Sequence, residues 1–223
     1  MSREGNRNLI LATLAFALCF SAWGMLAPLA PKLQDELGLS STETALMVSI
    51  PFVLVSLLRI PLGLVVDRFG GRLLFAAMLA YSAGAAVLVG FASSYEALLG
   101  AGLLLGVAGA SFAVGVPFVA GWFEPSRQGY ALGVYGVGNI GTAIAAFSVP
   151  AIRNSAGQAV AGIVFGVVIA AYALIWFSLA RDAPRRGPGV RYREVLGAGW
   201  RLWRLALLYF VTFGGFVAMA IFL

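Results

Sequence analysis

Arg59 is the residue whose type and position most clearly suggest chemistry. It is the only charge within an apolar run over residues 44–66, apart from the run's edges. A guanidinium near the middle of a membrane span costs several kcal/mol unless a pathway, a partner or a ligand holds it. Ser56 and Gly63 share its helix face, which is therefore small and polar and is expected to face the interior of a bundle. We predict that Arg59 meets an anionic ligand, with backbone carbonyls, water or a group outside this sequence as the alternatives.

A glycine-rich run over residues 133–142 contains the spacing G-x-G-x-x-G. A dinucleotide site would need a preceding strand and a βαβ unit, whereas this run lies inside an unbroken apolar stretch. Close helix packing is the expected role of its glycines, which are Gly133, Gly136, Gly138 and Gly141. Asn139 is not explained by packing alone. Its amide could bind a small oxyanion or form an interhelical hydrogen bond.

A charged turn over residues 63–72 carries Gly63, Asp67, Arg68, Gly70 and Arg72. The plain interpretation is a hydrophilic hairpin whose backbone conformation is permitted by glycine. Asp67 is expected at a helix C-terminus, where the helix dipole disfavours an acid by some tenths of a kcal/mol. We therefore expect Asp67 to have a compensating partner, either Arg68 or Arg72.

Aromatic side chains form two smaller signals. Phe112 lies among small residues over 109–115, which would clear space around its ring. Tyr209, Phe213 and Phe216 share one helix face at spacings of four and seven residues. Taken alone, these patterns indicate packing.

The composition excludes most other classes of protein. The chain has 223 residues, of which 61% are hydrophobic and 11% charged, with mean hydropathy +0.94. Soluble domains carry about 25% charged residues, and disordered chains are polar. One cysteine, Cys19, and no histidine leave no disulfide framework, no zinc spacing and no thiol–imidazole pair. We expect a membrane protein that is not an enzyme and binds no metal or cofactor.

Seven apolar runs are long enough to cross a bilayer as helices, which need roughly 20 residues each. They cover residues 8–31, 44–66, 73–95, 97–123, 128–152, 154–180 and 205–223. The first exceeds the apolar core of a cleaved signal peptide, so we expect it to be retained, with a proline-bent end at 25–31. The sequence predicts an all-α membrane protein.

The basic residues predict the orientation. With the N-terminus inside, 12 of the 15 lie in cytoplasmic segments, and the opposite loops hold only Lys32 and Arg153. We therefore expect a cytoplasmic N-terminus. Low Lys and high Arg content indicates a GC-rich bacterial genome, so we expect a bacterial inner membrane. The positive charge then belongs to the inner face, and nucleic-acid binding is not expected.

Three parts are expected: a six-helix bundle over 1–180, a basic cytoplasmic linker over 181–203, and a seventh helix over 204–223. The linker region to residue 204 carries seven arginines with interleaved tryptophans. It predicts either an interfacial helix on anionic lipid or a solvated loop. Because the seventh run stops at Leu223 without a polar flank, we expect a partial sequence.

These features together resemble the N-terminal half of the major facilitator superfamily, whose turn motif has the form G-x-x-x-D-R-x-G-R. Residues 63–72 match that motif, with Gly71 placed before Arg72. More narrowly, residues 133–141 resemble the fifth-helix glycine signature of the nitrate/nitrite porters. The resemblance implies two inverted three-helix repeats, followed by the first helix of a second bundle.

The resemblance also implies roles for individual residues. Arg59 would be the substrate arginine, Asn139 a binding amide, Phe112 and Phe213 the rings that sandwich the anion, and Tyr209 the hydroxyl beside it. The turn over 63–72 would stabilise one state of an alternating-access cycle. No cofactor is implied.

The implied function is secondary transport of a small oxyanion, nitrate or nitrite. Exchange is favoured over proton symport, because no carboxylate lies inside a span of this chain. A complete pathway would need the missing C-terminal half or a second protomer. The alternatives are transport of another, organic anion or metabolite, and a half-transporter that acts only as a pairing module.

Overall fold

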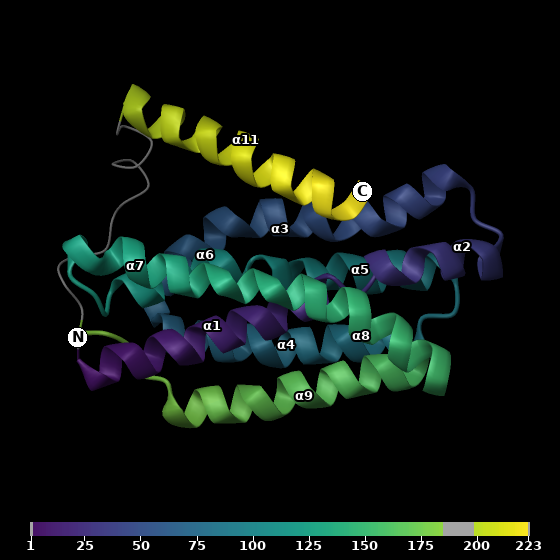
Figure 1. Ribbon diagram of the computed structural model, residues 1–223, viewed down its shortest axis with the longest axis horizontal. Helices are drawn as coiled ribbons and strands as arrows, with labels where there is room; N and C mark the ends of the chain where they lie inside the picture. The colour runs from purple at the N-terminus through teal and green to yellow at the C-terminus, as the bar shows by residue number, and fades with distance from the viewer. Residues whose placement is uncertain (1, 185–198, 223) are drawn as a thin grey trace. The chain divides into compact units, whose positions relative to one another are not determined.

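The computed structural model describes residues 2–184 and 199–222, and all regular structure in those ranges is helical (Figure 1). The first helices are α1 (Arg3–Trp23), η1 (Ala27–Leu29), α2 (Ala30–Leu37), α3 (Ser41–Phe69), α4 (Gly71–Phe91) and α5 (Tyr95–Gly109). They are followed by α6 (Ser111–Ala120), α7 (Pro125–Gly136), η2 (Val137–Asn139), α8 (Ile140–Ala156), α9 (Gln158–Leu179) and α11 (Trp200–Phe222).

Six helical stretches of the described chain are long and apolar enough to cross a membrane. They overlap the first six apolar runs, so the all-helical, multi-pass prediction is confirmed. The first span includes the expected bend, since α1 ends at Trp23 and the chain continues through η1 into α2.

Two interruptions inside spans were not predicted. The fourth span breaks at Ala110, whose N–H bonds back to Val107 as well as to Gly106, and the fifth passes through the short η2 turn. Both breaks lie at glycine-rich sequence, where the missing Cβ atoms lower the barrier to leaving regular α geometry.

The chain divides into two compact units, residues 1–186 and 187–223. The first unit is the six-span bundle. In the second unit the structure describes α11, which is the helix expected over 205–223. The predicted linker structure falls mostly on residues 185–198, outside the described residues.

Two single-glycine links within the bundle have the same backbone conformation. Gly70 joins α3 to α4 with φ 86° and ψ 153°, and Gly157 joins α8 to α9 with φ 94° and ψ 165°. Figure 1 shows these links at opposite ends of the bundle. Matching links at opposite ends of the bundle agree with the inverted repeat that was expected.

Side chains next to these links reinforce the relationship. Beyond the first link, Arg72 Nη2 donates to the Phe177 carbonyl of α9 at 2.6 Å. Beyond the second, Gln158 Nε2 donates to the Val89 and Ala92 carbonyls at the end of α4, at 2.8 and 3.0 Å. A side chain just after each link is thus hydrogen-bonded to the C-terminal end of a helix in the other pair, α9 for the first link and α4 for the second.

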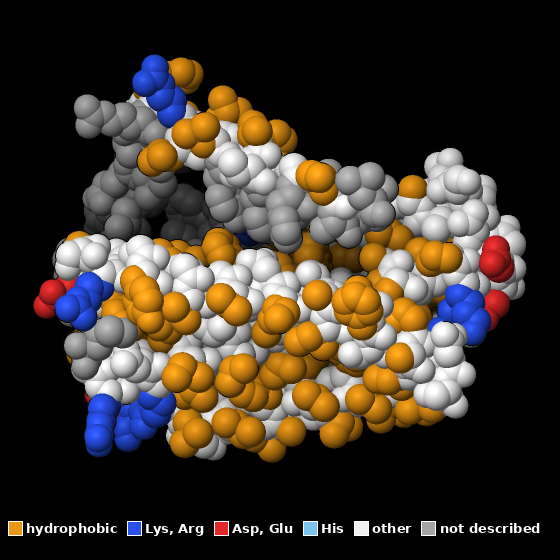
Figure 2. Space-filling view, in the orientation of Figure 1, with side chains coloured by type: hydrophobic (Ala, Val, Ile, Leu, Met, Phe, Trp, Pro, Cys, Tyr) orange, Lys and Arg blue, Asp and Glu red, His pale blue; other side chains and the backbone are white. Residues whose placement is uncertain are grey.

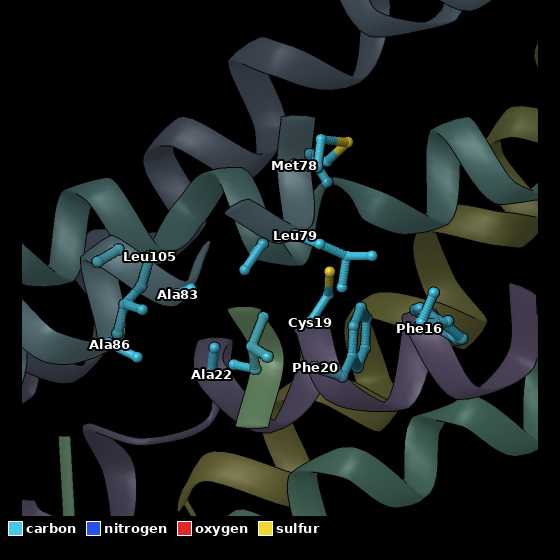
Figure 3. Close-up of a cluster of buried hydrophobic side chains, with 14 of the residues drawn as sticks. Phe16, Cys19, Phe20, Ala22, Met78, Leu79, Ala83, Ala86 and Leu105 are labelled. Carbon is cyan, nitrogen blue, oxygen red and sulfur yellow. The ribbon is translucent and has the colours of Figure 1, made fainter. Parts of the chain in front are cut away.

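Small residues set the close contacts between the helices. A Cβ built on Gly162 of α9 would lie 2.7 Å from the Ala86 carbonyl of α4, so the two backbones touch there. Figure 3 shows the core beside this contact, where Phe16, Cys19 and Phe20 of α1 face Leu79 and neighbouring residues of α4. Helices associate in lipid through such packing, because burial of apolar surface gives little driving force there.

The flank of the bundle is apolar, and its charged side chains gather at the two ends in the view of Figure 2. Phe147 is 80% exposed and Leu174 is 72% exposed, although both lie within spans. This distribution is typical of a protein surrounded by lipid.

Candidate functional site

Three aromatic rings form a layer near the middle of the bundle. Phe16 of α1 stacks on Tyr135 of α7, with ring centroids 4.8 Å apart and an interplanar angle of 22°. Phe112 of α6 lies tilted against both, at 5.6 Å from Phe16 and 5.9 Å from Tyr135. Phe16 and Tyr135 are fully buried and Phe112 is half-buried, so Phe112 is the exposed edge of this layer.

Glycine makes room for the layer on its inner side. The Tyr135 ring crosses α6 at Gly115, where a built Cβ would overlap its hydroxyl. That hydroxyl lies 3.4 Å from the Ser111 carbonyl oxygen. The ring position therefore depends on Gly115 having no side chain.

The contacts of α3 with α5 locate the part of α3 that carries Arg59. A Cβ on Gly106 would lie 2.7 Å from the Leu54 side chain, and a Cβ on Gly109 would lie 2.6 Å from that of Val55. Both helices run the same way (Figure 1), so Arg59 lies about one turn of α3 beyond this contact, in the direction in which α5 leads to α6. Arg59 is half-buried on this part of α3.

Asn139 lies in η2, beside the same layer. Its neighbour Gly138 lies against the Phe16 ring, with a built Cβ 2.9 Å from Cγ of that ring. The amide Nδ2 donates to the Gly136 carbonyl at 2.7 Å. Asn139 Oδ1 is buried and has no hydrogen-bond partner among the described residues. The amide thus retains one free N–H and one free acceptor.

The four glycines of the 133–142 run fall into two pairs. Gly138 and Gly141 meet α1, and a Cβ on Gly141 would overlap the Ala17 carbonyl oxygen and lie 2.8 Å from the Ser21 nitrogen. Gly133 and Gly136 have no described atom within 4 Å of a built Cβ. The first pair allows close packing within the bundle, while the second leaves a smooth strip on its surface.

The turn over 63–72 occupies the end of the bundle that also holds Arg3 of α1 and the end of α9 (Figure 1). Arg68 is exposed, with its guanidinium 5.3 Å from the centre of the Phe69 ring. Gly63 has open space around it. Asp67 belongs to α3, but its side chain lies outside what the structure describes, so its expected partner is not tested.

Arg72 is held by α9. Its guanidinium lies 4.9 Å from the centre of the Phe177 ring, in addition to the bond to the Phe177 carbonyl. Trp176 Nε1 donates to the Arg72 carbonyl at 2.8 Å, and Asp182 accepts from the Arg72 backbone N–H at 2.8 Å. The sequence did not identify Asp182, because no periodicity connects it with a residue 110 positions earlier.

Two of the predicted site residues belong to α11. The side chains of Tyr209 and Phe213 lie outside the described residues, and the second unit is described only by itself. Of the remaining predicted residues, Phe112 and Asn139 lie beside Phe16, and Arg59 lies about one turn beyond the contact of α3 with α5. The sequence did not predict that Phe16 and Tyr135 would pack against Phe112. Tyr135 does belong to the glycine-rich run over 133–142 that singled out Asn139.

The candidate site combines the guanidinium of Arg59, the ring of Phe112 and the primary amide of Asn139. A guanidinium binds planar oxyanions through paired N–H groups, and a primary amide offers further N–H donors. In the described ranges no cluster of three His, Cys, Asp or Glu residues could hold a metal ion. The arrangement is suited to anion recognition.

Comparison with curated proteins identifies close relatives along nearly the whole chain. The probable nitrate/nitrite transporter NarK2 of Mycobacterium tuberculosis (strain CDC 1551 / Oshkosh) is 38% identical, over 96% of this chain and 56% of its own. The probable nitrate/nitrite antiporter NarK1 of Thermus thermophilus is 37% identical, over 96% and 52%. The nitrite extrusion protein of Bacillus subtilis (strain 168) is 34% identical, over 97% and 55%.

The chain thus spans about half the length of the curated relatives it matches. Their names confirm the resemblance to the nitrate/nitrite porters that the fifth-span glycines indicated.

Solved structures share the fold at lower identity. A bacterial homologue of the human lysosomal transporter Spinster, in an inward-facing and occupied conformation, superposes with a TM-score of 0.74 at 18% identity, over 83% of this chain and 46% of that one. The unoccupied form gives 0.72 at 19% identity, over 96% and 50%. The family model of the major facilitator superfamily matches residues 12–223. The chain therefore belongs to the major facilitator superfamily.

Proposed function

We propose that this chain is the N-terminal part of a secondary transporter that carries nitrate or nitrite by alternating access. The observation that carries the proposal is Arg59, a half-buried cation within the apolar helix α3, in a chain whose curated relatives are named for nitrate and nitrite. A cation at that depth is expensive, and an anionic substrate offsets its cost.

In this proposal Arg59, Phe112 and Asn139 each have one task. Arg59 donates charge-assisted hydrogen bonds to two oxygens of the planar anion. Phe112 stacks on one face of the anion, and the free N–H of Asn139 completes the donor set on this side. Tyr209 and Phe213 of α11 would contribute a hydroxyl and the second ring.

The remaining donors and the second wall of the pathway would come from helices beyond this chain or from a second protomer. The two bundles would then rock about the site. The smooth strip at Gly133 and Gly136 would allow the partner bundle to approach closely. The turn over 63–72 would stabilise one of the two states.

The orientation belongs to the same proposal. The N-terminus and the turn would face the cytoplasm of a bacterial inner membrane, because that end of the bundle carries most of the basic residues. Exchange of nitrate for nitrite is the favoured coupling, because the acidic residues of this chain lie outside the spans or at their edges.

The test is flux in proteoliposomes. The chain alone and the chain fused to the C-terminal half of a related nitrate/nitrite porter are reconstituted, and uptake of labelled nitrate and nitrite is measured. We expect flux from the fusion and its loss in Arg59→Ala. A folded fusion that carries an organic anion but neither nitrate nor nitrite would overturn the substrate assignment.

A further inference from the structure

Four residues after α9 tie together three parts of the bundle. We call residues 180–183 the exit segment, because the described part of the bundle ends one residue later. The Arg181 backbone N–H donates to Oδ1 of the buried Asn8 of α1 at 2.9 Å, and the Arg181 guanidinium lies 4.0 Å from Glu4. Ala183 contacts the chain at Gly121, where a built Cβ would lie 3.2 Å from the Ala183 Cβ.

Asp182 connects the exit segment to the turn over 63–72. Its Oδ1 accepts from the Arg72 backbone N–H at 2.8 Å. Its Oδ2 would lie 2.6 Å from a Cβ built on Gly70, whose φ of 86° is a conformation suited to glycine. The carboxylate therefore sits directly on the link between α3 and α4.

This position has two electrostatic consequences. The first four N–H groups of a helix have no partner inside it, and Asp182 satisfies one of them in α4. A carboxylate at a helix N-terminus also interacts favourably with the helix dipole. The N-cap residue itself, Gly70, has no side chain that could do either.

Arg72 also contacts two neighbouring residues of α9, Trp176 and Phe177. Its carbonyl accepts from Trp176, and its guanidinium donates to Phe177 and stacks on that ring. Arg72 is thus fixed by the last turn of α9 on one side and by Asp182 on the other. The turn cannot move against α9 without breaking these bonds.

We propose that Asp182 is a positioning residue for the turn over 63–72, which it holds by capping α4 at Arg72. The inference rests on the proposed function only in assigning that turn a role in the transport cycle; the contact itself involves no anion.

The test is amide hydrogen exchange at single-residue resolution on the chain in lipid nanodiscs. In Asp182→Ala the Arg72 amide is expected to exchange at least tenfold faster than in the wild type, while amides of 83–90 in the α4 core keep their protection. Asp182→Asn retains an acceptor oxygen and is expected to recover most of the protection.

A matched control comes from the other end of the exit segment. Asn8→Ala removes the acceptor for the Arg181 N–H, so it should speed exchange at Arg181 and leave Arg72 unchanged. If Asp182→Ala does not yield folded protein, Asp182→Ser carries the test, because its hydroxyl ends short of the Arg72 nitrogen. Wild-type exchange at Arg72 in either variant would overturn the proposal.

A second readout separates positioning from general stability. In the fusion used for nitrate flux, Asp182→Ala is expected to lower the maximal rate several-fold at an unchanged half-saturating concentration, and Asp182→Asn to restore it. A changed half-saturating concentration at a normal maximal rate would overturn the assignment. A wild-type fusion without flux would count against the proposed function alone, and amide exchange would still decide the role of Asp182.

Discussion

Arg153 of α8 forms an ion pair with Glu36 of α2, with 2.5 Å between Nη2 and Oε2. The side chain of Arg153 is only 7% exposed, whereas that of Glu36 is 50% exposed. Arg153 Nη1 is buried and has no hydrogen-bond partner among the described residues. The pair joins the first span to the fifth at the end of the bundle opposite the turn over 63–72 (Figure 1).

Glu36→Ala is therefore expected to destabilise the bundle by about 1–3 kcal/mol, because it leaves a buried guanidinium without its counter-charge. The value lies below that of a fully buried pair, since water reaches Glu36. Unfolding by SDS titration in mixed micelles measures the change. Lys32→Ala is the control: its exposed bond to Asn154, at 3.1 Å, should contribute less than about 0.5 kcal/mol. Equal effects of the two variants would contradict this prediction.

The fold was predictable because a lipid bilayer leaves few alternatives to the helix for a segment that crosses it. Apolar runs such as 73–95 and 154–180 must be helices, and their lengths located them to within a few residues. The breaks at Ala110 and at η2 were not predictable. Glycine permits such a break without requiring one, and the deciding contacts, such as Gly138 on Phe16, join segments far apart in the sequence.

The candidate site was predictable where a residue was anomalous for its surroundings. Arg59 and Asn139 are polar in apolar runs, so their types alone singled them out. Phe16 and Tyr135 are ordinary residues for a span, and only the packing of α1, α6 and α7 brings them to Phe112. Asp182 stands outside a span, where an acid attracts no attention.

Gly141→Ala and Gly133→Ala should differ strongly although they lie on the same stretch. A methyl group at Gly141 would overlap the Ala17 carbonyl, so α1 and the fifth span would have to separate, at a cost of about 2–4 kcal/mol. At Gly133 the methyl group meets open space and should change bundle stability by less than about 1 kcal/mol, in either direction. SDS titration of the chain compares the two variants.

The same pair tests the smooth strip. If Gly133 faces a partner bundle, Gly133→Ala should reduce nitrate flux in the fusion while the stability of this chain is unchanged. Normal flux in that variant would show that close approach at Gly133 is not needed.

Arg59→Lys is expected to weaken anion binding at least tenfold although the positive charge is kept. A guanidinium presents two parallel N–H groups to two oxygens of a planar anion, whereas an ammonium is a point charge with no such geometry. Competition by nitrate against a labelled anion in the fusion measures the affinity, with Arg68→Lys on the exposed turn as the control for loss of an arginine. Wild-type affinity in Arg59→Lys would remove Arg59 from the site.

Asn139→Asp should abolish anion binding near pH 7, and more completely than Asn139→Ala. The aspartate would lose the Nδ2 bond to the Gly136 carbonyl and place a negative charge beside that oxygen and beside the anion site. Asn139→Ala loses the same bond but adds no charge, so it should bind weakly rather than not at all. Nitrate competition on the fusion ranks the variants, and SDS titration shows whether each bundle is intact. If the two variants bind alike, the amide serves η2 geometry through Gly136 and has no contact with the anion.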